Sequence, residues 1–369
     1  MTSATAFENF HFESVGSDIA ALETPVPLID LDVVEKNVRR WQASCDAAGI
    51  ANRPHIKTHK LVPLAKAQIA VGAKGISVQK LGEAEVMAAA GIRDMLLTFN
   101  VVGASKLTRL AALARTTDIA VVADSVEIVD GIAEAGAAAG RPIRVLVECD
   151  TGAGRNGVAT PAAALALAQM ISKRNAVRFG GLMTYPKPGT RAAAAAFFAE
   201  ARALCEKAGL PVETITTGGS PDMWSNEGLG GVTEYRAGSY IYKDRTLLSH
   251  GNTVADCALT VLSTIVSRPA ADRAIIDAGS KALTSDQLGQ AGFGVVPALG
   301  DTLVSMIHEE HGFLDLSQLA ESAKPRVGDT IRILPNHGCP VSNLFDKVVF
   351  VRGSQVLGAL PVDARGKVQ

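Results

Sequence analysis

The alternation of short apolar runs with alanine-rich stretches is the feature that most constrains the fold of this chain. Eight runs rich in apolar or β-branched residues follow one another, at 26–32, 53–57, 75–79, 94–98, 119–124, 143–150, 177–185 and 213–218. Helical patterns fill the segments between them, as at 63–71, 125–139, 161–172 and 191–208. This alternation predicts right-handed βαβ units and a parallel sheet. Eight units favour a closed (β/α)8 barrel of the TIM type over an open doubly wound sheet.

The pattern changes after about residue 250. Strand-like runs at 258–267, 273–277, 330–334 and 347–351 are separated by Gly and Pro turns, and long helical stretches disappear. This texture predicts a second, mainly β domain at the C-terminal end. We therefore expect an α/β chain in which residues 24–250 form the barrel, while 1–23 and 251–369 form the β domain.

Composition excludes several classes of partner and predicts the compartment. The formal net charge of −1 gives no broad attraction to nucleic acid or to an anionic membrane. No apolar run reaches the ~18 residues of a membrane span, and Met1–Ser14 lacks the basic start and apolar core of a signal peptide. An odd, scattered set of cysteines argues against disulfides and predicts a cytoplasmic protein: Cys45, Cys149, Cys205, Cys257 and Cys339.

Lys57 is the first candidate for chemistry. It stands in Arg53-Pro54-His55-Ile56-Lys57-Thr58-His59-Lys60, where the chain is expected to leave a strand. The common fate of such a lysine is a solvated surface cation. The alternative is an amine desolvated in a pocket, its pKa lowered from about 10.4 so that it can form a Schiff base.

Polar residues at the other predicted strand ends support the second interpretation. Active sites of these barrels lie at the carboxyl ends of the strands. Those ends carry, besides Lys57, the residues Gln79, Thr98, Asn100, Asp124, Asp150 with Arg155, Tyr185 and the turn Thr217-Gly218-Gly219-Ser220. A lysine, a glutamine, an arginine and a tyrosine that converge on one rim indicate a binding site.

Two glycine turns are candidates for a phosphate site. Thr216–Ser220 follows the eighth predicted strand, and Arg236-Ala237-Gly238-Ser239-Tyr240 comes shortly after it. Phosphate sites of such barrels form from the loops after strands seven and eight, where backbone N–H groups point at the anion. Either turn alone is common in proteins; together they predict a ligand that carries phosphate.

His337 and Cys339 are candidates for a metal site. In an extended segment, residues two apart project to the same face, and both types are good ligands for zinc. Two protein ligands with other positions open suit a catalytic metal better than a structural one. Polar residues of 287–294 and 307–312 are candidates to orient or complete it, and His55 and His59 are core or supporting groups beside Lys57.

These motifs together resemble one family. The segment 24–60, Asp150–Arg155, Thr217–Ser220, Asp277–Lys281, Glu310–Gly312 and His337–Cys339 are similar, in order, to the D-threonine aldolase/D-serine dehydratase family. Its members are fold-type III pyridoxal-phosphate enzymes, related through the barrel to alanine racemase. The resemblance covers nearly the whole chain.

The resemblance implies a role for each matching residue. Lys57 would hold pyridoxal 5'-phosphate as a Schiff base, Arg155 would contact its phenolic oxygen, and Gln79 and Tyr185 would line its ring. The phosphate cup would comprise Thr217, Gly218, Gly219, Ser220, Gly238, Ser239 and Tyr240. His337 and Cys339 would bind a divalent metal (zinc, manganese or magnesium) that takes the β-hydroxyl of the substrate.

Two reactions on β-hydroxy-D-amino acids remain open under this resemblance. Retro-aldol cleavage gives glycine and an aldehyde; β-elimination, on D-serine or 3-hydroxy-D-aspartate, gives a keto acid and ammonia. Cysteine at 339 is more typical of the dehydratases, whereas Asp277–Asp286 and Thr184-Tyr185-Pro186 are closer to the aldolases. We favour the aldolase. A non-catalytic pyridoxal-phosphate protein is the remoter alternative, and such proteins generally lack the β domain and the metal pair.

Assembly is also implied by the resemblance alone. Fold-type III enzymes are homodimers in which the β domain of one subunit helps to close the barrel mouth of the other. We therefore expect a homodimer that binds a small-molecule substrate and neither nucleic acid nor membrane.

Overall fold

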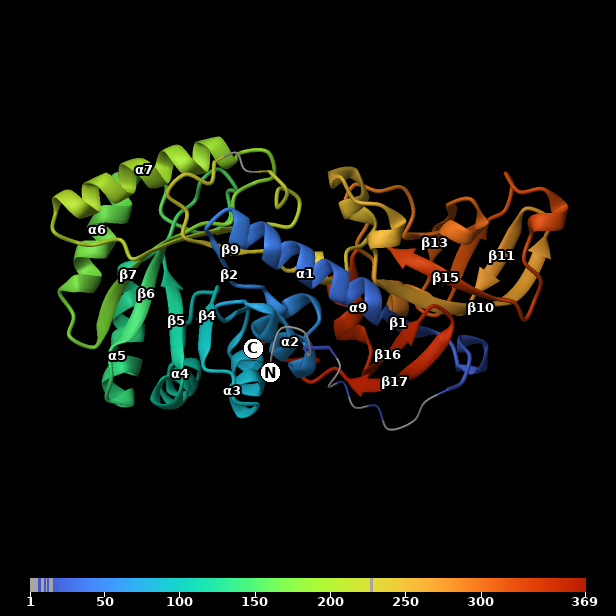
Figure 1. Cartoon of the computed structure of the whole chain (residues 1–369), viewed down its shortest axis with the longest axis horizontal. Helices are drawn as coiled ribbons and strands as arrows, with labels where there is room; N and C mark the ends of the chain where they lie inside the picture. The colour runs from blue at the N-terminus through green and yellow to red at the C-terminus, as the bar shows by residue number, and fades with distance from the viewer. Residues whose placement is uncertain (1–5, 8–9, 11, 13–15, 226–227) are drawn as a thin grey trace.

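The computed structural model describes residues 6–7, 10, 12, 16–225 and 228–369. Figure 1 shows two domains side by side, with helices α1 (Leu31–Ala47) and α9 (Gly338–Leu344) where they meet. One domain is built on a parallel sheet covered by helices, and the other is mainly β. This is the α/β barrel with a mainly β C-terminal domain that the sequence predicts.

The barrel sheet has eight parallel strands in the order β2-β9-β8-β7-β6-β5-β4-β3. A parallel bridge between His55, in the segment that follows β2, and Ser77 of β3 connects the two edges of this sheet. The strands are β2 (Ala51–Asn52), β3 (Ile76–Val78), β4 (Asp94–Leu97), β5 (Asp118–Ala123), β6 (Ile143–Glu148), β7 (Val177–Met183), β8 (Thr214–Gly218) and β9 (Glu234–Arg236). The connecting helices are α2 (Val62–Val71), α3 (Leu81–Ala89), α4 (Ala104–Thr116), α5 (Val126–Ala139), α6 (Pro161–Ser172) and α7 (Arg191–Lys207).

The β domain is a nine-stranded sheet in the order β11-β14-β13-β12-β15-β10-β1-β16-β17. An additional pairing of β11 with β10 closes six of these strands on themselves. The strands are β1 (Val26–Asp30), β10 (Leu259–Ala270), β11 (Arg273–Ile276), β12 (Gly294–Val296), β13 (Thr302–Ile307), β14 (Gly312–Asp315), β15 (Thr330–Pro335), β16 (Lys347–Arg352) and β17 (Gln355–Pro361). One short helix, α8 (Ser280–Leu283), follows β11.

The strand predicted at 26–32 is real, but its assignment to the barrel is wrong. β1 lies in the β domain, antiparallel to β10 and parallel to β16. The place of the eighth barrel strand is taken by β9, which pairs with β8 and β2. A strand that is buried on both faces has the same apolar sequence pattern in either sheet. The pattern of 26–30 therefore does not show which of the two sheets the strand joins. The short, polar β9 carries no apolar run that would reveal it.

Helix α1 links the domains. Asp30 ends β1 and caps α1, because its carboxylate accepts from the N–H groups of Asp32 and Val33 at 3.1 Å each. Further along, the buried amide of Asn37 donates to the carbonyls of Ile241 (3.2 Å) and Asp256 (2.9 Å). These bonds anchor α1 against the segment that follows β9, next to the carboxyl end of the barrel.

A buried ion cluster fills the opposite end of the barrel. The Arg53 guanidinium, 1% exposed, lies 2.7 Å from Glu234 at the start of β9 and 2.7 Å from Asp94 at the start of β4. Both partners satisfy the charge that burial would otherwise leave unpaired. The amino ends of the strands are thereby closed, and the open end is the carboxyl end.

Candidate functional site

A cavity of about 320 Å³ opens at the carboxyl end of the barrel, and residues of both domains line it. Ten of the thirteen residues predicted for the site line it: Lys57, Gln79, Arg155, Tyr185, Gly219, Ser220, Gly238, Ser239, His337 and Cys339. The other three, Thr217, Gly218 and Tyr240, lie behind its wall. The Thr217 carbonyl accepts from Arg236 at 3.2 Å, and the buried Tyr240 hydroxyl accepts from Gln68 at 2.8 Å. Their role in binding a ligand stays a prediction.

Lys57 does not lie on a strand; it is in the short 3-10 helix η3 (Ile56–Thr58) that follows β2. His55 caps this helix, because its Nδ1 accepts from the Lys57 backbone N–H at 3.4 Å. The ring proton is therefore on Nε2, which is 3.2 Å from Gln79 Oε1 and 3.1 Å from Thr98 Oγ1. Burial, with the positive charge of Lys57 second, holds the pKa of His55 well below its usual value. A neutral, fully bonded His55 thus fixes the turn that presents Lys57.

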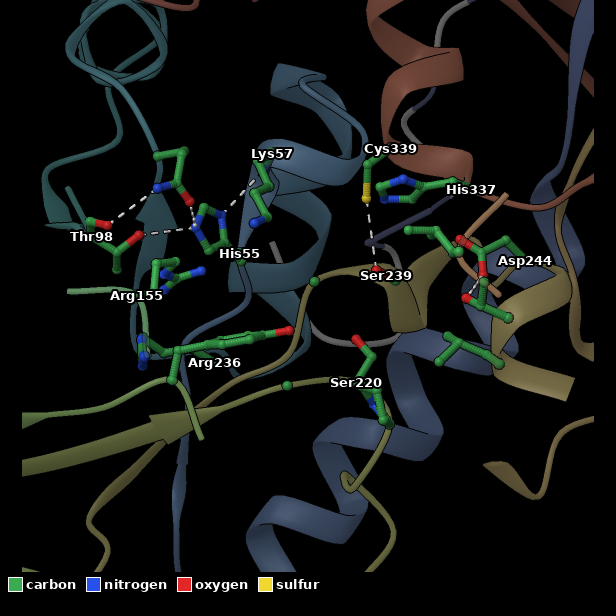
Figure 2. A pocket seen from close by; sticks show the side chains of 18 of the residues that line it. His55, Lys57, Thr98, Arg155, Ser220, Arg236, Ser239, Asp244, His337 and Cys339 are labelled. Carbon is green, nitrogen blue, oxygen red and sulfur yellow. Dashed lines mark hydrogen bonds between the residues drawn. The ribbon is translucent and has the colours of Figure 1, made fainter. Parts of the chain in front are cut away.

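His337 and Cys339 come from the β domain and face Lys57 in the same cavity (Figure 2). Thr58, next to Lys57, lies 3.2 Å from the Cys339 sulfur, and the Ser239 hydroxyl lies 3.7 Å from it. The extended segment predicted for this pair is wrong: His337 is the N-cap of α9, and Cys339 is in its first turn. The two side chains nevertheless lie together, since Pro335 ends β15 and the chain turns directly into the helix.

The surroundings of His337 and Cys339 favour the charged forms of both side chains, an imidazolium beside a thiolate. Burial alone would lower the pKa of His337, but Cys339 and Asp286 outweigh it and raise this pKa to about 9. Burial likewise opposes the Cys339 thiolate, yet His337 and Lys57 lower the thiol pKa. A thiolate is the form of cysteine that binds a metal.

Asp286 is a supporting residue that the sequence did not single out. Its carboxylate accepts from His337 Nδ1 at 2.7 Å, so Nε2 is the ring nitrogen that a metal would bind after displacing its proton. Such carboxylate partners orient metal-binding histidines in many proteins. Among the described residues no group of three or more His, Cys, Asp or Glu side chains could hold a metal. A metal at His337 and Cys339 stays a prediction.

Further residues line the cavity that were not predicted as site residues: Arg236, Asp244, Thr246, Leu247, Leu288, Met183 and Pro221. His55 and Thr98, which the sequence did indicate near Lys57 and on the rim, line it as well. Arg236 belongs to the second glycine arm and Leu288 to the segment 287–294, so both lie in motifs already noted. The other predicted segment, 307–312, does not reach the cavity. Nothing in the local sequence marks Leu247 or Thr246, because only the folded chain places them here.

Arg236 and the glycines offer the features of a ligand cradle. The Arg236 side chain donates to the carbonyls of Thr217 and Thr184, while its buried Nε has no partner. A Cβ on Gly238 would lie 3.1 Å from the His55 carbonyl, and Gly219 has φ +108°, a conformation that favours glycine. On the opposite wall, the Arg155 guanidinium lies 4.9 Å from the centre of the Tyr185 ring.

Both parts of the chain match known domain families. Residues 29–246 match the family described as "Alanine racemase, N-terminal domain", and residues 258–351 match "Putative serine dehydratase domain". None of the helices in the described part of the chain has the length and apolar character to cross a lipid bilayer.

Relatives span nearly the full length. D-threonine aldolase of Arthrobacter sp is 36% identical over 365 residues, which cover 95% of each chain. D-threo-3-hydroxyaspartate dehydratase of Delftia sp. (strain HT23) is 35% identical and covers 89% of this chain and 93% of its own. A solved cysteine-to-alanine variant of a dehydratase with the same name is described as a metal-free form. The crystal structure of D-threonine aldolase from Filomicrobium marinum superposes with a TM-score of 0.90 at 31% identity, over 97% of this chain and 100% of that chain.

Proposed function

The chain belongs to the D-threonine aldolase/D-serine dehydratase family of lyases, and we propose that it cleaves β-hydroxy-D-amino acids to glycine and an aldehyde. One observation carries the proposal. A lysine of the barrel and a His–Cys pair of the β domain face the same cavity, and Cys339 lies 3.2 Å from the neighbour of that lysine. The aldolase reaction needs both a site for an amine and a site for a hydroxyl, a few ångströms apart.

The family fold implies pyridoxal 5'-phosphate, and the cavity fits this group. Lys57 supplies the amine, and the unpartnered Arg236 Nε supplies a buried donor on the wall. Gly219 leaves open space where a side chain would stand, and Gly238 allows the chain to pack closely against His55 and Thr58. Gln79, Arg155 and Tyr185 would bound the ring, and Ser220 and Ser239 would meet the phosphate. When bound, the cofactor supplies an electron sink for the pair released at Cα, and a divalent metal at His337 and Cys339 supplies a Lewis acid for the hydroxyl.

Lys57 and His55 then have distinct roles in the reaction. In the retro-aldol step the hydroxyl loses its proton, the Cα–Cβ bond breaks, the aldehyde leaves, and Cα takes up a proton to give glycine. The Lys57 amine is the cavity group suited to return that proton, since Cys339 and His337 serve the hydroxyl. His55 stays neutral and holds the Lys57 turn, so it positions the amine without exchanging protons.

The D-configuration is part of the proposal. With the carboxylate and amine of the substrate held on the barrel side, only one configuration at Cα brings the β-hydroxyl to the side of His337 and Cys339. We therefore expect the L-enantiomers to be inert.

The alternative reaction is a dehydration. The observation that favours it is Cys339 itself, because a cysteine is the residue changed in the metal-free dehydratase variant. In that reaction the α-proton is removed and the hydroxyl leaves as water, and the product hydrolyses to a keto acid and ammonia.

Product analysis with D-threonine and D-serine separates these reactions. Acetaldehyde and glycine from D-threonine would support the aldolase. Ammonia with 2-oxobutanoate or pyruvate would instead make the protein a dehydratase. Turnover of neither, with cofactor bound, would contradict both and favour a non-catalytic protein.

The role of Lys57 has its own test. Reduction with borohydride should fix the cofactor on the peptide that contains Lys57, and Lys57→Ala should lose this label. Lys60 is a built-in control, because its amine is 2.7 Å from the buried Glu83 and is not part of the cavity. A label on any other lysine would refute the assignment.

Assembly and compartment complete the proposal. We propose a homodimer in the cytoplasm. All five cysteines are free, and four of them are buried, which suits a reducing compartment.

A further inference from the structure

The geometry points to the identity of the substrate's β-substituent: we propose that this enzyme selects an apolar, uncharged group there and discriminates against a β-carboxylate. The inference rests on the proposed function, because it takes the β-hydroxyl to lie at His337 and Cys339. The group on the same carbon must then lie at the same end of the cavity. D-threonine and its alkyl or aryl analogues fit this description, whereas 3-hydroxy-D-aspartate does not.

The wall at this end is defined by contacts with the α9 segment. The Asp244 carboxylate accepts from the Gly338 N–H at 2.9 Å, between His337 and Cys339 in the chain. The Thr246 hydroxyl donates to the other oxygen of Asp244 at 2.5 Å. Leu247 follows directly, and Leu288 lies two residues after the His337 partner Asp286. Figure 2 shows Asp244 and His337 together on this side of the cavity, away from Arg155 and Arg236.

Leu288 is unusual in two respects. It is 54% exposed although it is a large apolar residue, and it lines the cavity. Its backbone is in the left-handed region, with φ +49°. A β-carbon disfavours this region, and such outliers concentrate at ligand sites. The chain thus holds an apolar side chain at the cavity, where a ligand would cover it.

The Leu288 loop is fixed to the metal-site segment by Asn336. This residue is fully buried, and its amide donates to the carbonyls of Asp286 (3.4 Å), Gln287 (3.4 Å) and Gly292 (2.9 Å). Arg245 donates to Asn336 Oδ1 at 3.1 Å and also to the Ala291 carbonyl. Because Asn336 precedes His337, the apolar wall and the metal pair are held as one unit.

The charges at this end disfavour an anionic substituent. Asp244 lines the cavity there and Asp286 touches His337, whereas no described lysine or arginine lines that end. The cations of the lining, Lys57, Arg155 and Arg236, lie on the barrel side. Arg245 is engaged with Asn336 and does not line the cavity. A β-carboxylate would therefore approach the carboxyl groups of Asp244 and Asp286, and no lysine or arginine of the described cavity lining at that end would offset the repulsion.

Substrate kinetics test this inference. We expect kcat/KM for D-threonine and D-phenylserine to exceed that for 3-hydroxy-D-aspartate at least 100-fold, with all products measured. Leu288→Arg should shift the ratio toward 3-hydroxy-D-aspartate at least 10-fold. Leu288→Met, of similar size and without charge, should keep the ratio within 3-fold. Val266→Arg adds the same charge at an exposed β10 position away from the cavity and should leave the ratio unchanged.

A binding measurement separates the inference from the reaction. D-2-aminobutyrate and D-aspartate lack the hydroxyl and differ in the β-substituent, so their dissociation constants can be read from the cofactor's absorbance. We expect the first to bind at least 10-fold more tightly. Equal binding, or 3-hydroxy-D-aspartate turned over as well as D-threonine, would overturn the inference while the lyase function stands. Tighter binding of D-2-aminobutyrate with no turnover of any substrate would overturn the proposed function alone.

Discussion

At the scale of single residues, the site depends on which nitrogen of His337 is free. Asp286 accepts a hydrogen bond from Nδ1 at 2.7 Å. Its carboxylate is 42% exposed, so its position depends on the loop that carries it. The sequence revealed His337 and Cys339 because their residue types indicate ligands. It could not reveal Asp286, since an aspartate fifty-one residues away acquires its role only through folding.

Asp286→Asn is expected to weaken metal binding about 10- to 100-fold, because the histidine loses its orienting carboxylate. Affinities for zinc and manganese can be measured by competition with a chelator. Asp118→Asn, which removes an exposed carboxylate at the far end of the barrel, should leave them unchanged. Unaltered affinity in Asp286→Asn would show that His337 does not need this partner.

His59 makes the stability of the protein depend on pH. Burial lowers the pKa of this fully buried ring from 6.5 to about 3, so the folded protein keeps it neutral. The unfolded chain binds a proton at 6.5, and stability therefore falls as the pH drops from 6.5 toward 3. The loss from this one ring is about 2 kcal/mol at pH 5.

Chemical unfolding at pH 7 and pH 5 measures this effect. His59→Asn removes the titrating ring, so its stability should change less between the two values than that of the native protein. His250→Asn, at a partly exposed site, is the control and should follow the native protein. An equal pH response in all three proteins would contradict the assignment to His59.

At the scale of elements, the sequence predicts most strands and helices but misplaces two. Helices α5 and α6 lie within a residue of their predicted bounds, because alanine-rich stretches between strands leave little choice. The sequence assigns β1 to the wrong sheet and does not reveal β9. The sheet that each strand joins depends on its pairing with segments far away in the chain, which a local pattern does not show. The turn of the chain into α9 was missed for the same reason: Gly338 is fixed by Asp244, ninety-four residues away.

The loop at 284–292 is the element whose loss we expect to matter most. Asn336→Ala removes the three hydrogen bonds that the side-chain amide donates to carbonyls of this loop. Because the buried carbonyls lose their donor, the free energy of unfolding should fall by about 2 kcal/mol. The KM for D-threonine should rise about 10-fold, since the cavity wall loosens. Asn343→Ala, on α9 but outside the cavity, is the matched control. A less stable protein with an unchanged KM would mean that the loop is not a wall of the site.

At the scale of the whole molecule, one chain brings the candidate site residues of both domains to the same cavity. Lys57 comes from the barrel and Cys339 from the β domain of the same chain. The rim of the barrel still exposes large apolar residues: Phe99 is 40% exposed and Val102 is 63% exposed on the loop after β4. The domain bounds, 24–250 for the barrel and 1–23 with 251–369 for the β domain, stay a prediction except at β1, which pairs within the β-domain sheet.

We expect sedimentation to show a homodimer at micromolar concentration, since a second chain would cover this apolar rim. Replacement of Val102 by Asp should weaken the dimer, whereas Val266→Asp, on the β domain, should not. A monomer with full activity would contradict the expectation.

The position of β1 has a consequence for how the chain is made. β1 ends at Asp30, but its partners β10 and β16 begin at Leu259 and Lys347, so the barrel is an insertion within the β domain. A ribosome adds about 5–20 residues per second, so the strand waits on the order of ten seconds or longer for its first neighbour. During synthesis the barrel can fold, while an apolar strand with unpaired backbone groups remains attached at its start. The nascent chain is therefore most exposed to misassociation at β1, and the β domain is the last of the two domains to close.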